Sequence, residues 1–205
     1  MWEFLRAGGP FMVLLVLTSI VGLTFVIERG LALRWPKVIP LRVEAALENC
    51  RTREDLARLR HVCTEEPSPL SRLVTIAHDH LDSPREENTD AIQTHARHEV
   101  LQLERGLVVL EVVVGIAPLM GLVGTLHGLI TLFGDLGVAG LSDNAVVAKG
   151  IAIALNTTLM GLLIAIPSLI AWSYYTKKVE TMAIEMETLC DEFLRRQYRL
   201  NPRRS

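Results

Sequence analysis

Polar side chains inside two long uncharged stretches are the residues of this sequence that could do chemistry. Thr125 and His127 lie in one stretch, and Asn156, Thr157 and Thr158 lie in the other. In hydrocarbon, a hydroxyl offers a donor and an acceptor to an ionisable partner that lacks water. A single threonine indicates little, because it can bond to its own helix backbone. Threonines at corresponding places on two adjacent helices are more informative.

The sequence contains few of the residue patterns that catalysis or metal binding requires. The histidine clusters are His78-x-His80 and His95-x-x-His98-Glu99. His95 and His98 have helical spacing, but no third or fourth ligand accompanies them, so they fit a solvated helix face better than a metal site. The sequence has no glycine-rich phosphate loop, no nucleophile elbow and no paired carboxylate in an uncharged stretch. We therefore expect no enzyme activity, no metal and no cofactor.

Composition excludes two further classes of protein. The net charge is −2, which gives no overall attraction to nucleic acid. Cys50, Cys63 and Cys190 are odd in number and widely spaced, so they predict neither a disulfide framework nor paired metal ligands. Half of the residues are hydrophobic, and they gather in long uncharged blocks. We expect an integral membrane protein in contact with lipid.

Three uncharged blocks are long enough to cross a bilayer. They are Ala7–Ile27 with 21 residues, Val112–Gly134 with 23 and Gly150–Thr176 with 27, and only His127 among them can carry a proton. A helix needs about 20 apolar residues to span the hydrocarbon layer. The first block lacks an Ala-x-Ala exit, so it reads as a retained anchor rather than a signal peptide. The predicted fold is all-α, with three transmembrane helices and long cytoplasmic helical extensions.

Basic residues near the block ends predict the orientation. Residues 29–42 carry four of them, and Lys177 and Lys178 follow the third block, whereas the connection 135–144 has none. Lys149 is the exception. We expect a periplasmic N-terminus and a cytoplasmic C-terminus. The predicted segments are a first transmembrane helix (1–36), a cytoplasmic helical segment (37–106), a second transmembrane helix (107–134), a periplasmic hairpin (135–144), a third transmembrane helix (145–176) and a cytoplasmic tail (177–205).

The polar segments also carry helix signals. Ser68-Pro69 is typical of an N-cap followed by a first-turn proline, and Ser83-Pro84-Arg85-Glu86 repeats the signal with a capping box. No helix breaker follows before Gly106, so the sequence predicts one helix running from near Pro84 into the membrane.

The tail carries a heptad-like apolar stripe of Val179, Met182, Met186, Leu189 and Phe193. It predicts that the third span and the tail form one helix of about 50 residues. The stripe packs either against the chain's own 37–105 helices or along a seam between subunits.

Two motifs resemble a known family. Ala117-Pro118-Leu-Met-Gly121-Leu-Val-Gly124-Thr125, followed by Lys149-Gly150-Ile-Ala and then Thr158 and Gly161, is similar to the MotA/TolQ/ExbB proton-channel family, in its three-span ExbB/TolQ branch. The resemblance implies a homopentamer around a central pore in the bacterial inner membrane. It also implies two copies of an ExbD/TolR-like single-span partner, whose aspartate is protonated beside Thr125 and Thr158.

Helix geometry gives an independent expectation for the pore face. At about 100° per residue, each of the two threonines shares its helix face with apolar residues only. This pattern favours a sleeve around apolar partner helices over a water-filled channel. The predicted apolar lining is Pro118, Leu122, Leu129, Ile151, Ala154, Leu155, Leu162 and Ala165.

The sequence departs from the family pattern at two positions. Ile153 stands where the ExbB branch has a glutamate, and His127 stands where tryptophan is frequent. His127 and Asn156 each lie about 200° around their helix from the nearby threonine, so we expect both to face away from the pore. Each packs against a neighbouring helix or takes a secondary polar role, and Thr157 is a third secondary candidate.

Two function classes stay open at this stage. The first is the shell of an ion-driven motor that transduces energy across the envelope. The second is a structural membrane scaffold without ion transport. An autonomous channel is disfavoured by the apolar pore face. The sequence names neither the process powered nor the partner, and it favours proton over sodium only through the small number of oxygen ligands.

Overall fold

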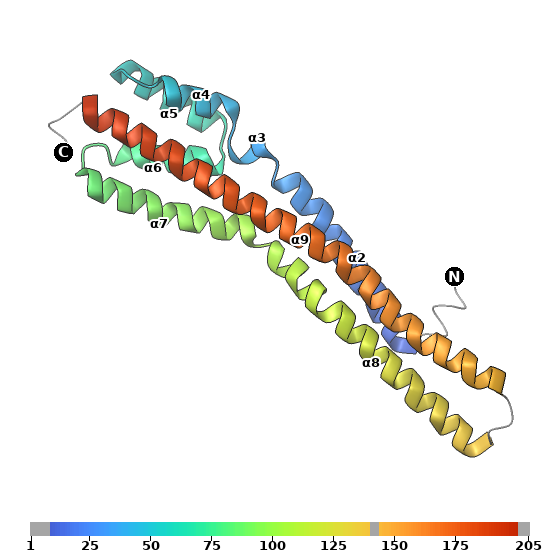
Figure 1. Ribbon diagram of the computed structural model, residues 1–205. Coiled ribbons are helices and arrows are strands. Elements are labelled where there is room, and N and C mark those ends of the chain that lie inside the picture. Colours follow the sequence, from blue (N-terminus) through green and yellow to red (C-terminus); the bar gives the residue numbers. More distant parts are fainter. Residues whose placement is uncertain (1–8, 140–143, 201–205) are drawn as a thin grey trace. The chain divides into compact units, whose positions relative to one another are not determined.

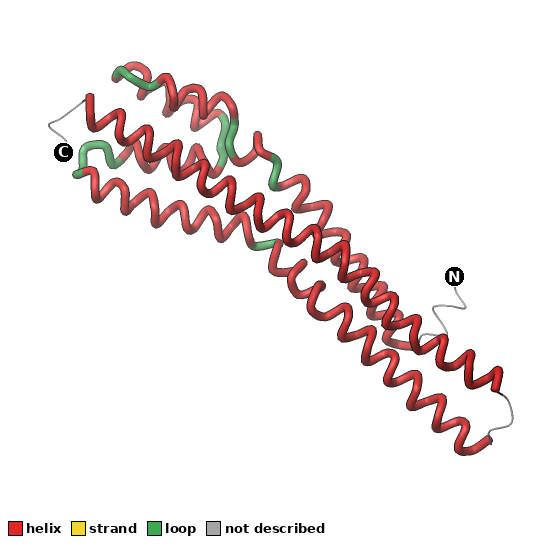
Figure 2. Tube along the Cα trace, in the orientation of Figure 1, coloured by secondary structure: helices red, strands yellow, loops and turns green. Residues whose placement is uncertain are grey.

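Helices make up most of residues 9–139 and 144–200, which are the residues described in this computed structural model; short turns and loops join them, and no strand occurs in those ranges (Figure 2). The predicted start of the first span at Ala7 and residues 140–143 of the predicted hairpin lie outside them. The helices are α2 (Gly9–Ala32), α3 (Trp35–Val38), α4 (Leu41–Asn49), α5 (Arg53–Glu65), α6 (Pro69–Asp79), α7 (Arg85–Glu104), α8 (Leu107–Ala139) and α9 (Asn144–Leu200).

Three of these helices are long and apolar enough to cross a membrane. The qualifying stretches are Pro10–Ala32 in α2, Leu107–Gly134 in α8 and Gly150–Leu200 in α9. The expectation of an all-α protein with three membrane spans is confirmed. Proline lies inside α8 at Pro118 and inside α9 at Pro167 without ending either helix, as is common in membrane helices.

The chain divides into two compact units. The first holds α2 as far as Arg29 together with residues 106–174, which contribute α8 and the first part of α9. Its small core contains Leu15, Val113, Ala117 and Ile164. Its outer faces remain apolar and exposed, as at Ile20, which is 58% exposed. Such faces suit lipid or another apolar chain.

The second unit holds residues 30–105 and α9 from Tyr175 onward, so α4 to α7 pack with the end of α9 (Figure 1). Its core is aliphatic, with Leu47, Leu59, Leu73 and Ile92 among its buried members. Four of the five residues of the tail stripe, Met182, Met186, Leu189 and Phe193, belong to the same core, and Val179 is also buried. The stripe therefore packs against the chain's own helices, which decides between the two alternatives left open by the sequence.

Helix α9 is a single element of 57 residues. The expectation that the third span and the tail form one helix is confirmed. This helix contributes to both units.

The expectation of one helix from near Pro84 into the membrane is wrong, because Arg105 and Gly106 separate α7 from α8. The Arg29 guanidinium occupies the place where a Cβ on residue 106 would stand. Glycine is the residue that admits this approach, and glycine also weakens a helix.

Helix capping follows the sequence in one place and departs from it in another. The Ser68 hydroxyl accepts the backbone N–H of Ser71 at 3.1 Å, as expected for the N-cap of α6. The capping box expected at Ser83 is absent, because α7 begins one residue later with Pro84 at its N-cap. The Ser83 carbonyl instead accepts the Tyr198 hydroxyl at 2.8 Å.

Candidate ion-pathway site between helices α8 and α9

Three threonine hydroxyls meet where α8 and α9 touch. Thr125 of α8 contacts both Thr157 and Thr158 of α9, with 3.3 Å between the Thr125 and Thr157 Oγ1 atoms and a shorter contact to Thr158. The backbone carbonyls of Gly121 and Ala154 lie within the same group. Thr125 Oγ1 reaches them at 3.1 Å and 3.0 Å. Five oxygen atoms therefore form one hydrogen-bonded cluster, which we call the threonine cluster.

Thr157 is the member that sequence reasoning placed in a secondary role. Its Oγ1 lies 2.7 Å from the Ala154 carbonyl oxygen and 3.2 Å from that of Gly121. Its side chain is 1% exposed, against 8% for Thr125, while Thr158 is half-buried. The adjacency of two threonines was visible in the sequence, but which hydroxyl faces α8 depends on how the two helices pack.

Glycines bring the helices close enough for this contact. A Cβ on Gly121 would stand 2.8 Å from the Thr157 carbonyl oxygen, and one on Gly161 would stand 2.5 Å from the Ala117 carbonyl oxygen. Gly124 makes room for the Thr157 hydroxyl, which would lie 3.0 Å from a Cβ there. Small residues on both faces allow such backbone approach in lipid. Gly124 and Gly128, spaced four residues apart on α8, extend this small-residue contact, since a Cβ on Gly128 would stand 3.1 Å from the Ala154 Cβ.

The cluster is polar without being charged. No Asp, Glu, Lys, Arg or His belongs to it, so it cannot take up a proton by itself. Each hydroxyl can both donate and accept a hydrogen bond. The cluster can therefore stabilise either protonation state of a carboxyl group that reaches it from another chain.

The predicted apolar lining divides into exposed and buried residues. Leu122, Ile151, Leu155 and Leu162 are 39–58% exposed. Pro118 and Leu129 are half-buried. These residues remain candidates for a surface that another chain covers.

Two predicted lining residues require correction. Ala154 is 1% exposed and Ala165 is 6% exposed, so neither lies on a free face of the protomer. Ala154 fills the space beside Gly128, where its Cβ would stand 3.1 Å from a Cβ added to that glycine. Both alanines are small enough to be covered by the adjacent helices, which a rotation angle alone did not reveal.

The remaining polar residues of the spans lie apart from the cluster. His127 packs on Phe11 of α2, with ring centroids 5.5 Å apart. Asn156 is half-buried and makes no side-chain hydrogen bond to another residue of the described ranges. Ile153, which replaces a family glutamate, is also half-buried. His127 is otherwise exposed in the protomer, and its direction relative to a pore stays a prediction.

Two of the histidines singled out in the second unit, His80 and His98, are bonded to groups of their own helical turn. His80 Nδ1 lies 3.0 Å from the Ile76 carbonyl oxygen, and His98 Nδ1 lies 3.2 Å from the Gln102 amide. Among residues 9–139 and 144–200, no group of three His, Cys, Asp or Glu side chains is arranged to hold a metal ion.

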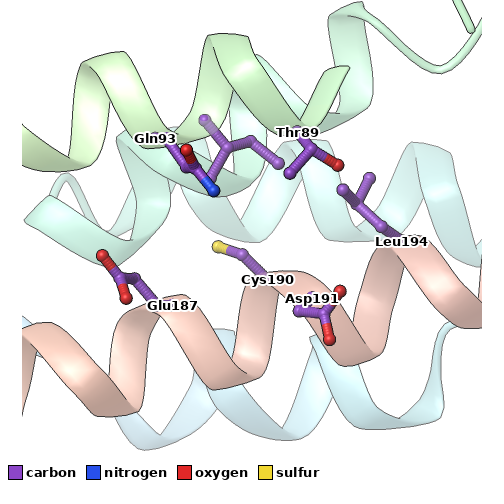
Figure 3. Close-up of a pocket in the computed structure, with 7 residues that line it drawn as sticks. Thr89, Gln93, Glu187, Cys190, Asp191 and Leu194 are labelled. Carbon is purple, nitrogen blue, oxygen red and sulfur yellow. The ribbon is translucent and has the colours of Figure 1, made fainter. Parts of the chain in front are cut away.

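A groove between α7 and the end of α9 also contains a thiol and carboxylate groups in its lining (Figure 3). It encloses about 180 Å³, with the Cys190 thiol pointing into it. Burial raises the pKa of this thiol to about 12, so the nucleophilic thiolate is scarce. Asp191 on its rim pairs with Arg85 at 3.3 Å and with Arg195 at 2.8 Å. The groove offers no activated group.

The structure thus has three apolar helices that can span a membrane, and a buried cluster of hydroxyl groups lies between two of them. These features are those of an integral membrane protein with a polar site inside its apolar region. Comparison with known proteins gives the family. Residues 65–188 match the model of the MotA/TolQ/ExbB proton channel family. The chain belongs to this family, whose members transduce energy through ion transport and are not enzymes.

Relatives match over most of the chain. The chain is 30% identical over 189 residues to a biopolymer transport protein ExbB homolog of Methanothermobacter thermautotrophicus, covering 91% of this chain and 67% of that protein. It is 34% identical over 180 residues to a biopolymer transport protein ExbB-like 1 of Synechocystis, covering 83% and 68%. It is 29% identical to the Tol-Pal system protein TolQ of Pseudomonas aeruginosa, covering 94% and 90%.

Proposed function

We propose that this chain is the shell subunit of a proton-motive-force-driven complex in the inner membrane. Five copies surround the transmembrane helices of two copies of a small ExbD/TolR-like partner. An aspartate in the partner's helix takes up and releases protons beside Thr125 and Thr158. The movement that follows is passed to a protein outside the membrane. The N-terminus is periplasmic and the C-terminus is cytoplasmic in this proposal.

One observation carries the proposal: Thr158 is half-buried while its hydroxyl belongs to the threonine cluster. A residue that is half-buried in the protomer keeps part of its surface open to another chain, so in this proposal a partner carboxyl group reaches Thr158 without separating α8 from α9. The exposed side chains of Leu155 and Leu162 are on the same helix and suit an apolar partner helix. A carboxylate against an apolar wall is costly unless hydroxyls bond to it. The cluster supplies those hydroxyls.

Replacing Thr158 by valine tests this function. The Thr158→Val complex, isolated from its source cells through a tag on this chain and placed in liposomes, should keep its composition and lose most proton flow. The loss should be about tenfold or more, the scale of one charge-assisted hydrogen bond. Thr131→Val is the matched control, because the Thr131 hydroxyl bonds only to the His127 carbonyl of its own helix.

Normal proton flow in Thr158→Val would contradict the assigned role of the threonine. A wild-type complex without any ion flow would contradict the proposed function as a whole and favour a structural scaffold. Flow that requires sodium in place of protons would keep the architecture and change the ion.

A further inference from the structure

We infer that Thr157 is a positioning residue, which makes the hydroxyl hydrogen of Thr158 available to a carboxylate by occupying the Ala154 carbonyl. This inference rests on the proposed function and deepens it. Thr157 itself is 1% exposed in the protomer, between α8 and α9, so it acts through its neighbours.

The cluster has fewer carbonyl acceptor sites than hydroxyl donors. A carbonyl oxygen has two lone pairs. Within a regular helix, the Ala154 carbonyl already accepts the backbone N–H of residue 158, and the Gly121 carbonyl accepts that of residue 125. Each carbonyl therefore has one place left for a hydroxyl. Three hydroxyls compete for these two places.

Thr157 holds one of the two places. Its Oγ1 is 2.7 Å from the Ala154 oxygen, closer than Thr125 Oγ1 at 3.0 Å. Thr125 and Thr158 are then left with the Gly121 carbonyl, at 3.1 Å and 3.2 Å. One of these two hydroxyls must donate to the other, which agrees with the close contact between them.

Because Thr125 and Thr158 share one carbonyl, the Thr158 hydroxyl can change its hydrogen-bond acceptor at little cost. When Thr158 turns its hydrogen toward an ionised carboxylate, Thr125 donates to the Gly121 carbonyl, so no carbonyl loses a bond. When the carboxyl group is protonated, it donates to Thr158 Oγ1, and Thr158 turns back. Without the Thr157 hydroxyl, Thr125 donates to the Ala154 carbonyl and Thr158 donates to the Gly121 carbonyl. Thr158 then has to break its hydrogen bond to Gly121 before it can donate to a carboxylate.

Few titratable groups surround the cluster to interfere with this effect. On α8 the nearest is His127, which packs on Phe11 of α2. Neither residues 9–27 of α2 nor residues 150–173 of α9 contain Asp, Glu, Lys, Arg, His, Cys or Tyr. At 1.5 Å per residue, the nearest charged residues along the two helices are Lys149 of α9, about 13 Å from Thr158, and Asp135 of α8, about 15 Å from Thr125, and Glu111 lies about 20 Å from Thr125.

The test is the pH profile of proton flow through the whole complex in liposomes. Thr157→Val keeps the shape of the side chain and removes the hydroxyl. It should shift the pH midpoint upward by about half to one unit, because the ionised carboxylate loses support on the scale of one net hydrogen bond. Thr157→Ser keeps the hydroxyl and should restore the wild-type midpoint.

The possible outcomes separate this inference from the proposed function. A Thr157→Val complex of normal composition with reduced flow at every pH and an unmoved midpoint would show a packing role only, and would overturn the inference. An unchanged profile would overturn it as well. A wild-type complex that conducts while Thr158→Val does not keeps the proposed function intact in either case.

Discussion

At the scale of single residues, the two units use buried polar groups in different ways. In the first unit, hydroxyls bond to backbone carbonyls and to one another, as in the threonine cluster. The second unit contains a buried salt bridge instead. Glu99 is only 6% exposed, and its carboxylate accepts hydrogen bonds from two nitrogens of the Arg72 guanidinium, with Nε at 2.6 Å. Hydroxyls suit hydrocarbon because they satisfy each other without a net charge.

The Arg72–Glu99 pair should stabilise the second unit. Glu99→Gln leaves the guanidinium without its carboxylate and should lower the free energy of unfolding by about 1–3 kcal/mol, a range reduced because Arg72 is half-exposed. Thermal unfolding followed by circular dichroism in detergent measures the change. Glu87→Gln, at an exposed position of α7, is the control and should have little effect. Equal melting temperatures for both variants would contradict the expectation.

The three thiols should be unreactive in the folded protein. Burial raises the pKa of Cys50 and Cys63 to about 11 and that of Cys190 to about 12. At pH 8 a maleimide should label them only after denaturation. Since the folded pKa values exceed the ordinary value near 9, the folded state retains protons that the unfolded state loses. Stability should therefore fall as pH rises from about 9 toward 12. Rapid labelling of the native protein would contradict this account.

At the scale of helices, block length and apolar spacing predicted most of what is observed. The three spans follow from stretches without charge, and the tail stripe predicted a buried face of α9. The break at Gly106 was not predicted, because it depends on Arg29, which is distant in sequence. The capping box expected at Ser83 was wrong because α7 begins one residue later, with Pro84 at its N-cap, while the Ser83 carbonyl accepts a hydrogen bond from the sequence-distant Tyr198.

The candidate site was predicted in part. The sequence identified Thr125 and Thr158 as candidates, but it gave Thr157 a secondary place. Helix rotation angles assume a helix in isolation, and they do not say how close two helices come. The approach of Gly121 to Gly161 decides this distance, and the contact of Ala154 with Gly128 buries that alanine.

The packing of α8 on α9 should depend on Gly161. An alanine there would place its Cβ 2.5 Å from the Ala117 carbonyl oxygen, a backbone atom that cannot move cheaply. Gly161→Ala should therefore destabilise the first unit by about 1–3 kcal/mol. Gly115→Ala, where no atom lies within 4 Å, is the control and should be neutral or slightly stabilising. The melting temperatures of the two variants in detergent check this, and equal values would contradict the packing described.

At the scale of the whole molecule, the exposed apolar faces indicate that the protomer is a part of something larger. Leu122 is 50% exposed, Leu155 58% and Leu162 43%. Lipid alone could cover these side chains, but Thr158, which is half-buried on the same helix as Leu155 and Leu162, adds a polar side chain to this apolar layer and suits the proposed partner. The family to which the chain belongs transports ions. A shell around partner helices accounts for both the apolar faces and the hydroxyl.

The native mass of the detergent-solubilised complex, isolated from its source cells through a tag on this chain, tests the central claim most directly. The account predicts five copies of this chain with two copies of one small protein, and a single transmembrane helix with an aspartate in that protein. A monomer, a dimer or a polydisperse mixture without such a protein would contradict it.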